Sequence, residues 1–92
     1  MKVTAIIEKG ADGMFSVRSE QKIGNHYFGG FGESVEIAKE DFLESIQEVI
    51  EESKEEGIDT PEDIQVSYYV IRHRNARVSS FVALFKGPSD HP

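Results

Sequence analysis

One stretch of the sequence decides the fold: residues 34–57, which are SVEIAKEDFLESIQEVIEESKEEG. Its apolar residues recur every three or four positions, the spacing that places side chains on one face of an α-helix. Ser34 is a favourable N-cap residue, Glu36 places a negative charge in the first turn, and Gly57 is typical of a helix end. The stretch therefore predicts one long amphipathic helix whose buried face comprises Val35, Ala38, Phe42, Ile46, Val49 and Ile50, with Leu43 beside them.

The opposite face of this helix is strongly acidic. It carries nine acidic residues against two lysines, so its charge of −7 equals the formal net charge of the whole 92-residue chain. The acids form either an ordinary solvated surface or a surface that also attracts a basic partner, because concentrated negative potential speeds encounter with positive charge. A basic cluster at residues 72–77 could contact RNA, an acidic partner or the acidic helix of another copy, and the last two are favoured. The residues that we expect to bind a partner are Glu40, Glu44, Glu48, Glu51, Arg72 and Arg74.

Four other segments have strand patterns. Residues 2–8 and 14–18 flank a turn at residues 9–13 whose glycine and aspartate tolerate positive φ, so they predict a β-hairpin. Residues 26–32 predict a third strand, and residues 64–71 alternate as in a further one. We expect an α+β fold, with a three- to four-stranded antiparallel sheet in the order strand, strand, strand, helix, strand, then a short helix or strand.

Glycine is concentrated just before the helix, in Gly29-Gly30-Phe31-Gly32. This run superficially resembles a phosphate-binding loop, but the Lys-Ser or Lys-Thr pair of a P-loop is missing, and Glu33 and Glu36 would repel phosphate. We favour a structural role, in which glycine permits a bulge or a close approach of the helix to the sheet.

Residues 77–86 have an ambiguous pattern. Their apolar residues have helical spacing, although part of the segment is also acceptable as a strand, and we favour a short helix. We expect a single domain over residues 1–86 and a disordered tail at residues 87–92. A chain of this size buries a modest core, so a homo-oligomer is expected. The residues predicted for its interface are Tyr68, Val78, Phe81, Val82 and Phe85.

Composition argues against several classes of function. The chain has no cysteine, and its three histidines are spread over the sequence, so we expect no metal site and no cofactor. No acid, base and nucleophile set is visible, so we expect no enzyme, and one that uses the acids and His26 is the least favoured hypothesis. The negative charge disfavours direct nucleic-acid binding, and no apolar run is long enough for a membrane span, so we expect a cytoplasmic protein.

The order of these segments resembles the HicB antitoxin family. Residues 5–9 with 12–17 resemble that family's first hairpin, and residues 32–38 resemble its Gly-x-Thr-x-x-Glu-Ala motif at the start of the helix, with Ser34 in place of Thr and Ile37 in place of the usual Glu. The resemblance covers residues 2–56, and residues 64–71 match a later strand more loosely. It implies a partial ribonuclease H-like fold without that enzyme's catalytic acids.

The resemblance also implies a function. In the family this domain neutralises a small basic RNA-cleaving HicA toxin, while a C-terminal module binds the operator. Only six residues follow Lys86, so we expect that DNA-binding module to be missing. The leading hypothesis is a non-enzymatic, antitoxin-type protein-binding domain that neutralises such a toxin. The alternative is an orphan regulatory or structural homo-oligomer that has lost its toxin or its DNA-binding module.

Overall fold

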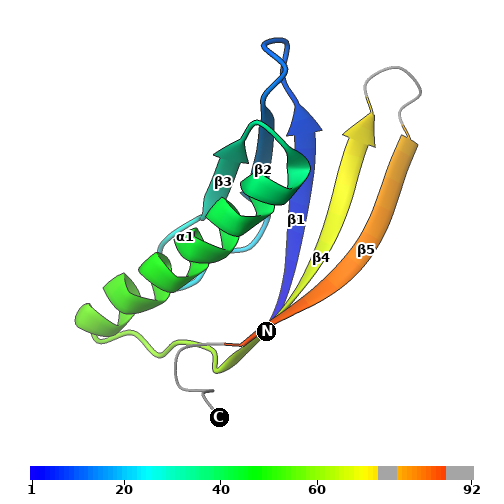
Figure 1. Ribbon diagram of the computed structural model, residues 1–92. Helices are drawn as coiled ribbons and strands as arrows, with labels where there is room; N and C mark the ends of the chain where they lie inside the picture. The colour runs from blue at the N-terminus through cyan, green and yellow to red at the C-terminus, as the bar shows by residue number, and fades with distance from the viewer. Residues whose placement is uncertain (73–76, 87–92) are drawn as a thin grey trace.

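The computed structural model describes residues 1–72 and 77–86, with side chains described for residues 1–71. Within these residues, five strands form one sheet in the order β3-β2-β1-β4-β5, and one helix lies across one face of it (Figure 1). This arrangement confirms the expected α+β class, a mostly antiparallel sheet packed against one long helix. The tail expected at residues 87–92 lies outside the described residues. In chain order the elements are β1 (Lys2–Lys9), β2 (Phe15–Ser19), β3 (Gly29–Gly32), α1 (Val35–Glu55), β4 (Asp63–Arg72) and β5 (Arg77–Lys86).

The sheet is mixed, which corrects the expectation of a wholly antiparallel one. β1, β2 and β3 pair antiparallel in succession, but β4 runs parallel to β1, with Val3 opposite Val66 and Ile7 opposite Val70. The path of the chain gives the reason. Since α1 carries the chain back to the end of the sheet where β1 starts, β4 sets out in the same direction as β1 (Figure 1).

The short helix favoured for the C-terminal segment is wrong, because Arg77–Lys86 forms the strand β5. It pairs antiparallel with β4 along its whole length, from Arg72 opposite Arg77 to Asp63 opposite Lys86. A neighbouring strand offers partners for the backbone N–H and C=O groups of this segment, and that pairing outweighs a spacing that is also compatible with a helix.

The core lies between α1 and the sheet. Alternate residues of β1 and β4 face the helix and are buried, as the period of two in a strand requires. Phe42 is fully buried, with its ring centroid 5.5 Å from that of Phe28 and 6.1 Å from that of Tyr68. The apolar face predicted for the helix is confirmed at its buried positions Ala38, Phe42, Ile46, Val49 and Ile50.

The ends of α1 are fixed by the residues that the sequence indicates. The Oγ of Ser34 accepts a hydrogen bond from the backbone N–H of Ile37 at 3.1 Å, as expected of an N-cap. After the last turn Gly57 adopts a φ of 77°, which glycine tolerates without steric cost. Within the described ranges, no helix has the length and apolar character needed to cross a membrane.

Candidate protein-binding surface

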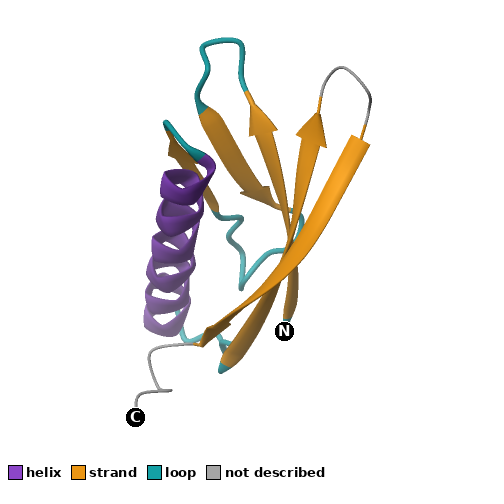
Figure 2. Ribbon diagram, turned by 45° about the vertical axis from the view of Figure 1, so that its right-hand side comes forward, coloured by secondary structure: helices purple, strands orange, loops and turns teal. Residues whose placement is uncertain are grey.

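The outward side of α1 carries the predicted acidic residues in one row. Glu40, Glu44, Glu48 and Glu51 follow each other at intervals of three or four residues, and all four are exposed. In Figure 2 the helix forms a layer of its own beside the sheet, so one of its sides is turned away from every strand. We call these four glutamates the acidic face.

An apolar residue interrupts this surface near its N-terminal end. Ile37 lies three, four and seven residues before Glu40, Asp41 and Glu44, so it points outward with them, and it is 48% exposed. Beside it Phe31 of the edge strand β3 is 53% exposed. These five residues line a shallow open hollow of about 360 Å³, which we call the Phe31–Ile37 groove.

The groove exists because α1 lies unusually close to β3. A Cβ atom on Gly30 would collide with the carbonyl oxygen of Ala38 and with the backbone of Phe42, and one on Gly32 would meet the side chain of Ile37. Only glycine leaves room for the two backbones at this distance. The predicted structural role of the glycine run, as a site of close helix-to-sheet approach, is therefore confirmed.

Side chains of α1 close the free edge of β3. The backbone N–H of Phe31 donates to Oδ2 of Asp41 at 3.0 Å, and that of Gly29 donates to Oγ of Ser45 at 3.2 Å. An unpaired strand edge is otherwise a template for pairing with another chain. Because two of its donors are already satisfied, β3 does not offer an open edge for an added strand.

The C-terminal end of α1 has a different environment. His26, in the loop between β2 and β3, places Nε2 3.2 Å from Oε1 of Glu56 and Nδ1 3.8 Å from Oε2 of Glu52. These two acids therefore contact a side chain of the same molecule. The residue considered for the least favoured enzyme hypothesis thus lies beside the end of the helix, and its ring links the loop to that end.

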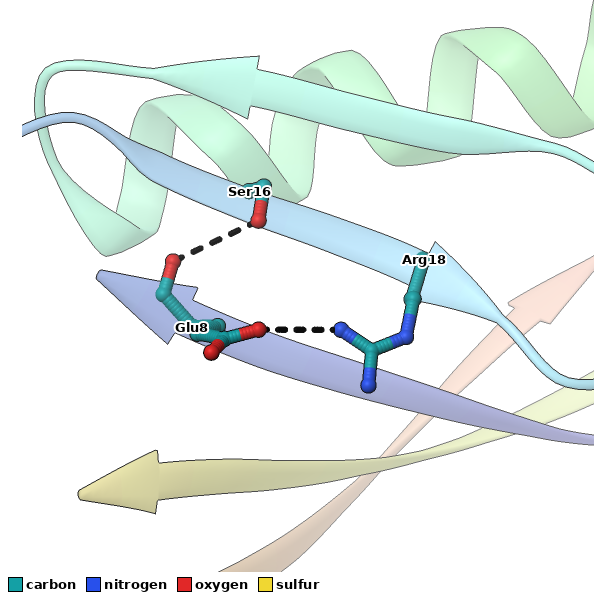
Figure 3. Close-up of polar contacts among 3 residues, drawn as sticks. All are labelled: Glu8, Ser16 and Arg18. Atoms are coloured by element: carbon teal, nitrogen blue, oxygen red, sulfur yellow. Dashed lines mark hydrogen bonds and ion pairs between the residues drawn. The ribbon is translucent and has the colours of Figure 1, made fainter. Parts of the chain in front are cut away.

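A second hollow, of about 520 Å³, opens at the β1–β2 hairpin and includes Glu8 and Ser16 in its lining. Figure 3 shows how the polar groups lie there: Nη1 of Arg18 is 3.1 Å from Oε1 of Glu8, and Oγ of Ser16 donates to the carbonyl oxygen of Glu8 at 3.4 Å. Arg18 lies opposite Ile6, two residues before Glu8, so Glu8 and Arg18 are diagonal neighbours on the two strands. The carboxylate of Glu8 therefore has a structural partner in the sheet.

Tyr68, predicted for an oligomer interface, belongs to the core instead. It is 1% exposed, and its ring lies beside Phe42 and under the ammonium group of Lys39, whose Nζ is 4.8 Å from the ring centroid. Burial raises the pKa of Tyr68 above its ordinary value of 10.0. The negative charge of Glu36 is the second cause and raises the pKa further. Because the side chain of Tyr68 points into the core, it offers no surface for contact with a second copy of the chain.

The remaining predicted residues, apart from Arg74, belong to the strands β4 and β5. Arg72 ends β4, opposite Arg77, whereas Arg74 lies outside the described residues. The other four predicted interface residues occur on β5, whose backbone pairs with β4. They are Val78, Phe81, Val82 and Phe85.

Sequence reasoning did not identify Phe31 and Ile37 as surface residues. For Ile37 the signal exists, since it falls outside the apolar series that predicts the buried face and its helical neighbours are acids. No comparable signal exists for Phe31, because its position beside the helix depends on the close approach at Gly30 and Gly32.

The surface offers negative charge beside exposed apolar area, a combination that suits noncovalent binding of a protein. Within residues 1–72 and 77–86, no group of three or more His, Asp or Glu side chains is placed to hold a metal ion. Comparisons of the chain with models of protein families, with curated proteins and with solved structures find no match.

Proposed function

We propose that this chain is a non-enzymatic protein-binding domain of the HicB antitoxin type, which binds and neutralises a small basic RNA-cleaving toxin in the cytoplasm. The observation that carries the proposal is the acidic face, in which four exposed glutamates lie on one side of α1. In the part of the chain that the structure describes, none of these four forms an ion pair. Their charge is therefore available to a basic surface.

The resemblance of residues 2–56 to the HicB family supports the same proposal independently of charge. The hairpin, the third strand and the N-capped acidic helix occur in the order that the resemblance implies. A sheet with a helix on one face is also consistent with a partial ribonuclease H-like fold, although topology alone does not specify function.

Co-expression with the product of an adjacent gene, where that product is a small basic protein, tests this function. We expect a complex that survives size-exclusion chromatography, with a mass by light scattering equal to the sum of the bound chains. Raising the salt concentration should weaken the complex, because screening acts on exposed charges. Separate elution of the two proteins at low salt contradicts the antitoxin proposal.

The second candidate is an orphan regulatory or structural homo-oligomer. β5 supports it, because this ten-residue strand stands at the end of the sheet order and pairs on one side with β4. The other side of such a strand is suited to pairing with a second copy. Light scattering of the chain alone discriminates: a stable dimer that is indifferent to basic proteins favours this candidate, and a monomer argues against it.

A further inference from the structure

Two exposed apolar side chains meet in the Phe31–Ile37 groove. Among the described residues, four large apolar side chains are well exposed: those of Met1, Tyr27, Phe31 and Ile37. Single exposed apolar residues are normal on a protein surface. Tyr27 has the ammonium of Lys22 5.0 Å from its ring centroid, but Phe31 and Ile37 line one common hollow. The groove thus combines apolar area with concave shape.

Three of the five residues that line this groove are acidic. Glu40, Asp41 and Glu44 line it, and no ion pair involves these three carboxylates within the part of the chain that is described. Lys39 follows Ile37 closely in sequence, yet its ammonium group lies over the ring of Tyr68. Apolar side chains next to carboxylates are complementary to an apolar side chain that has a cation beside it.

We propose that the Phe31–Ile37 groove binds a segment of a basic protein in which an arginine or lysine lies next to a large apolar residue. The apolar residue contacts Phe31 and Ile37, and the cation contacts the carboxylates of Glu40 and Glu44. This inference rests on the proposed function and specifies which part of the helix makes the central contact. Small interface regions of this kind, with an apolar anchor inside a polar rim, carry most of the binding energy in many complexes.

The structure also restricts the form of the bound segment. The N–H groups of Gly29 and Phe31 on the edge of β3 already donate to Ser45 and Asp41, so the segment binds through its side chains and not as an added strand. A small molecule is a poor occupant, because small-molecule sites enclose most of the ligand surface and this hollow is shallow. A protein segment needs no such enclosure.

Three short synthetic peptides of equal length test the inference by titration into the ¹⁵N-labelled protein. One alternates arginine with leucine, one arginine with serine, and one glutamate with leucine. We expect the arginine–leucine peptide to shift the amide resonances of Phe31, Ile37, Glu40 and Glu44 and to bind about tenfold or more tightly than either control, a difference of about 1.4 kcal/mol. Equal binding of the two arginine peptides overturns the inference, because charge alone would then explain the binding. The inference is also overturned if the amide resonances of these four residues do not shift, or if only resonances far from the groove shift.

Matched variants give a second, independent readout. Phe31→Ser combined with Ile37→Ser should weaken the arginine–leucine peptide about tenfold or more, whereas Tyr27→Ser, which removes an exposed aromatic ring elsewhere, should leave binding unchanged. Circular dichroism verifies that each variant is folded. If a basic toxin binds and the double variant binds it equally well, the groove is excluded while the proposed function stands. If the peptide binds as expected and no toxin is found, the proposed function fails, whereas the proposal that the groove binds such a segment stands.

Discussion

The carboxylate of Asp41 accepts a hydrogen bond from the backbone N–H of Phe31 at 3.0 Å, so a helix side chain closes the edge of the sheet. Asp41 also lines the Phe31–Ile37 groove. One residue therefore fixes the strand that supplies Phe31 and contributes negative charge beside it. The binding surface and the protection of the strand edge depend on the same contact.

Two substitutions of Asp41 distinguish the loss of its hydrogen-bond acceptor from the loss of its negative charge. Asp41→Ala removes the acceptor, and we expect the free energy of unfolding to fall by about 1 kcal/mol, the usual contribution of one hydrogen bond. Asp41→Asn keeps an acceptor oxygen and should be close to the original protein in urea unfolding. Amide hydrogen exchange at Phe31 should accelerate in Asp41→Ala only. Equal exchange rates in the two variants would show that the contact does not protect the edge.

Gly30 should tolerate substitution least among the glycines of the sheet. A Cβ atom at this position collides with the backbone of Ala38 and Phe42, which cannot move without shifting α1. We expect Gly30→Ala to lower the free energy of unfolding by about 2 to 3 kcal/mol, as overpacking does. Gly13, at φ 85° with open space around it, is the matched control, and Gly13→Ala should cost about 1 kcal/mol. Urea denaturation measures both, and a smaller loss at Gly30 than at Gly13 would contradict the close helix approach.

The buried phenol of Tyr68 makes stability depend on alkaline pH. Its pKa is raised in the folded protein, first by burial and second by Glu36, so the folded state holds the phenol proton more tightly than the unfolded chain does. The resulting stability is fully present below the unfolded pKa of 10.0 and is lost as pH rises through the folded pKa.

Urea midpoints measured from neutral pH to above pH 10.0 test this dependence. Tyr68→Phe should show a smaller loss of stability over the alkaline range than the original protein, whatever its stability at neutral pH. Tyr27→Phe, which alters an exposed ring, should follow the original protein. If all three curves fall in parallel, the buried phenol is not the source of the alkaline loss.

The sequence predicts the helix well because its information is local. The apolar spacing, the N-cap at Ser34 and the glycine at position 57 all act within a few residues, and each has the predicted role in the structure. The direction of β4 could not be obtained in this way, since it depends on where α1 returns the chain. For residues 77–86 the short helix was favoured over the strand for a related reason: the strand form of β5 depends on β4 as a pairing partner, which helical spacing alone does not reveal.

The candidate site was predictable only in part. The acidic face follows directly from helical periodicity, and its four glutamates are exposed as expected. Placing Tyr68 at an interface was wrong because alternation in a strand identifies two faces without indicating which one the helix covers. The groove depends on contacts between residues 31 and 37–44 across two elements, which become visible only in three dimensions.

The most direct test of the central claim is a growth-rescue experiment with two variants. They have the same net charge but lose negative charge at different positions of the protein. Cells that express a small basic toxin identified by the co-expression experiment would receive the original protein or one of two variants, each lacking four negative charges. The first changes the acidic face through Glu40→Gln, Glu44→Gln, Glu48→Gln and Glu51→Gln. The second changes exposed acids elsewhere through Glu20→Gln, Asp59→Asn, Glu62→Gln and Asp63→Asn.

Both variants have the same net charge, so the location of the charge is what differs between them. The account predicts that the original protein and the second variant restore growth, whereas the first variant fails although it accumulates as a folded protein. Equal rescue by the two variants would contradict the claim that the outward side of α1 binds the toxin, and failure of the original protein to rescue would contradict the antitoxin function itself.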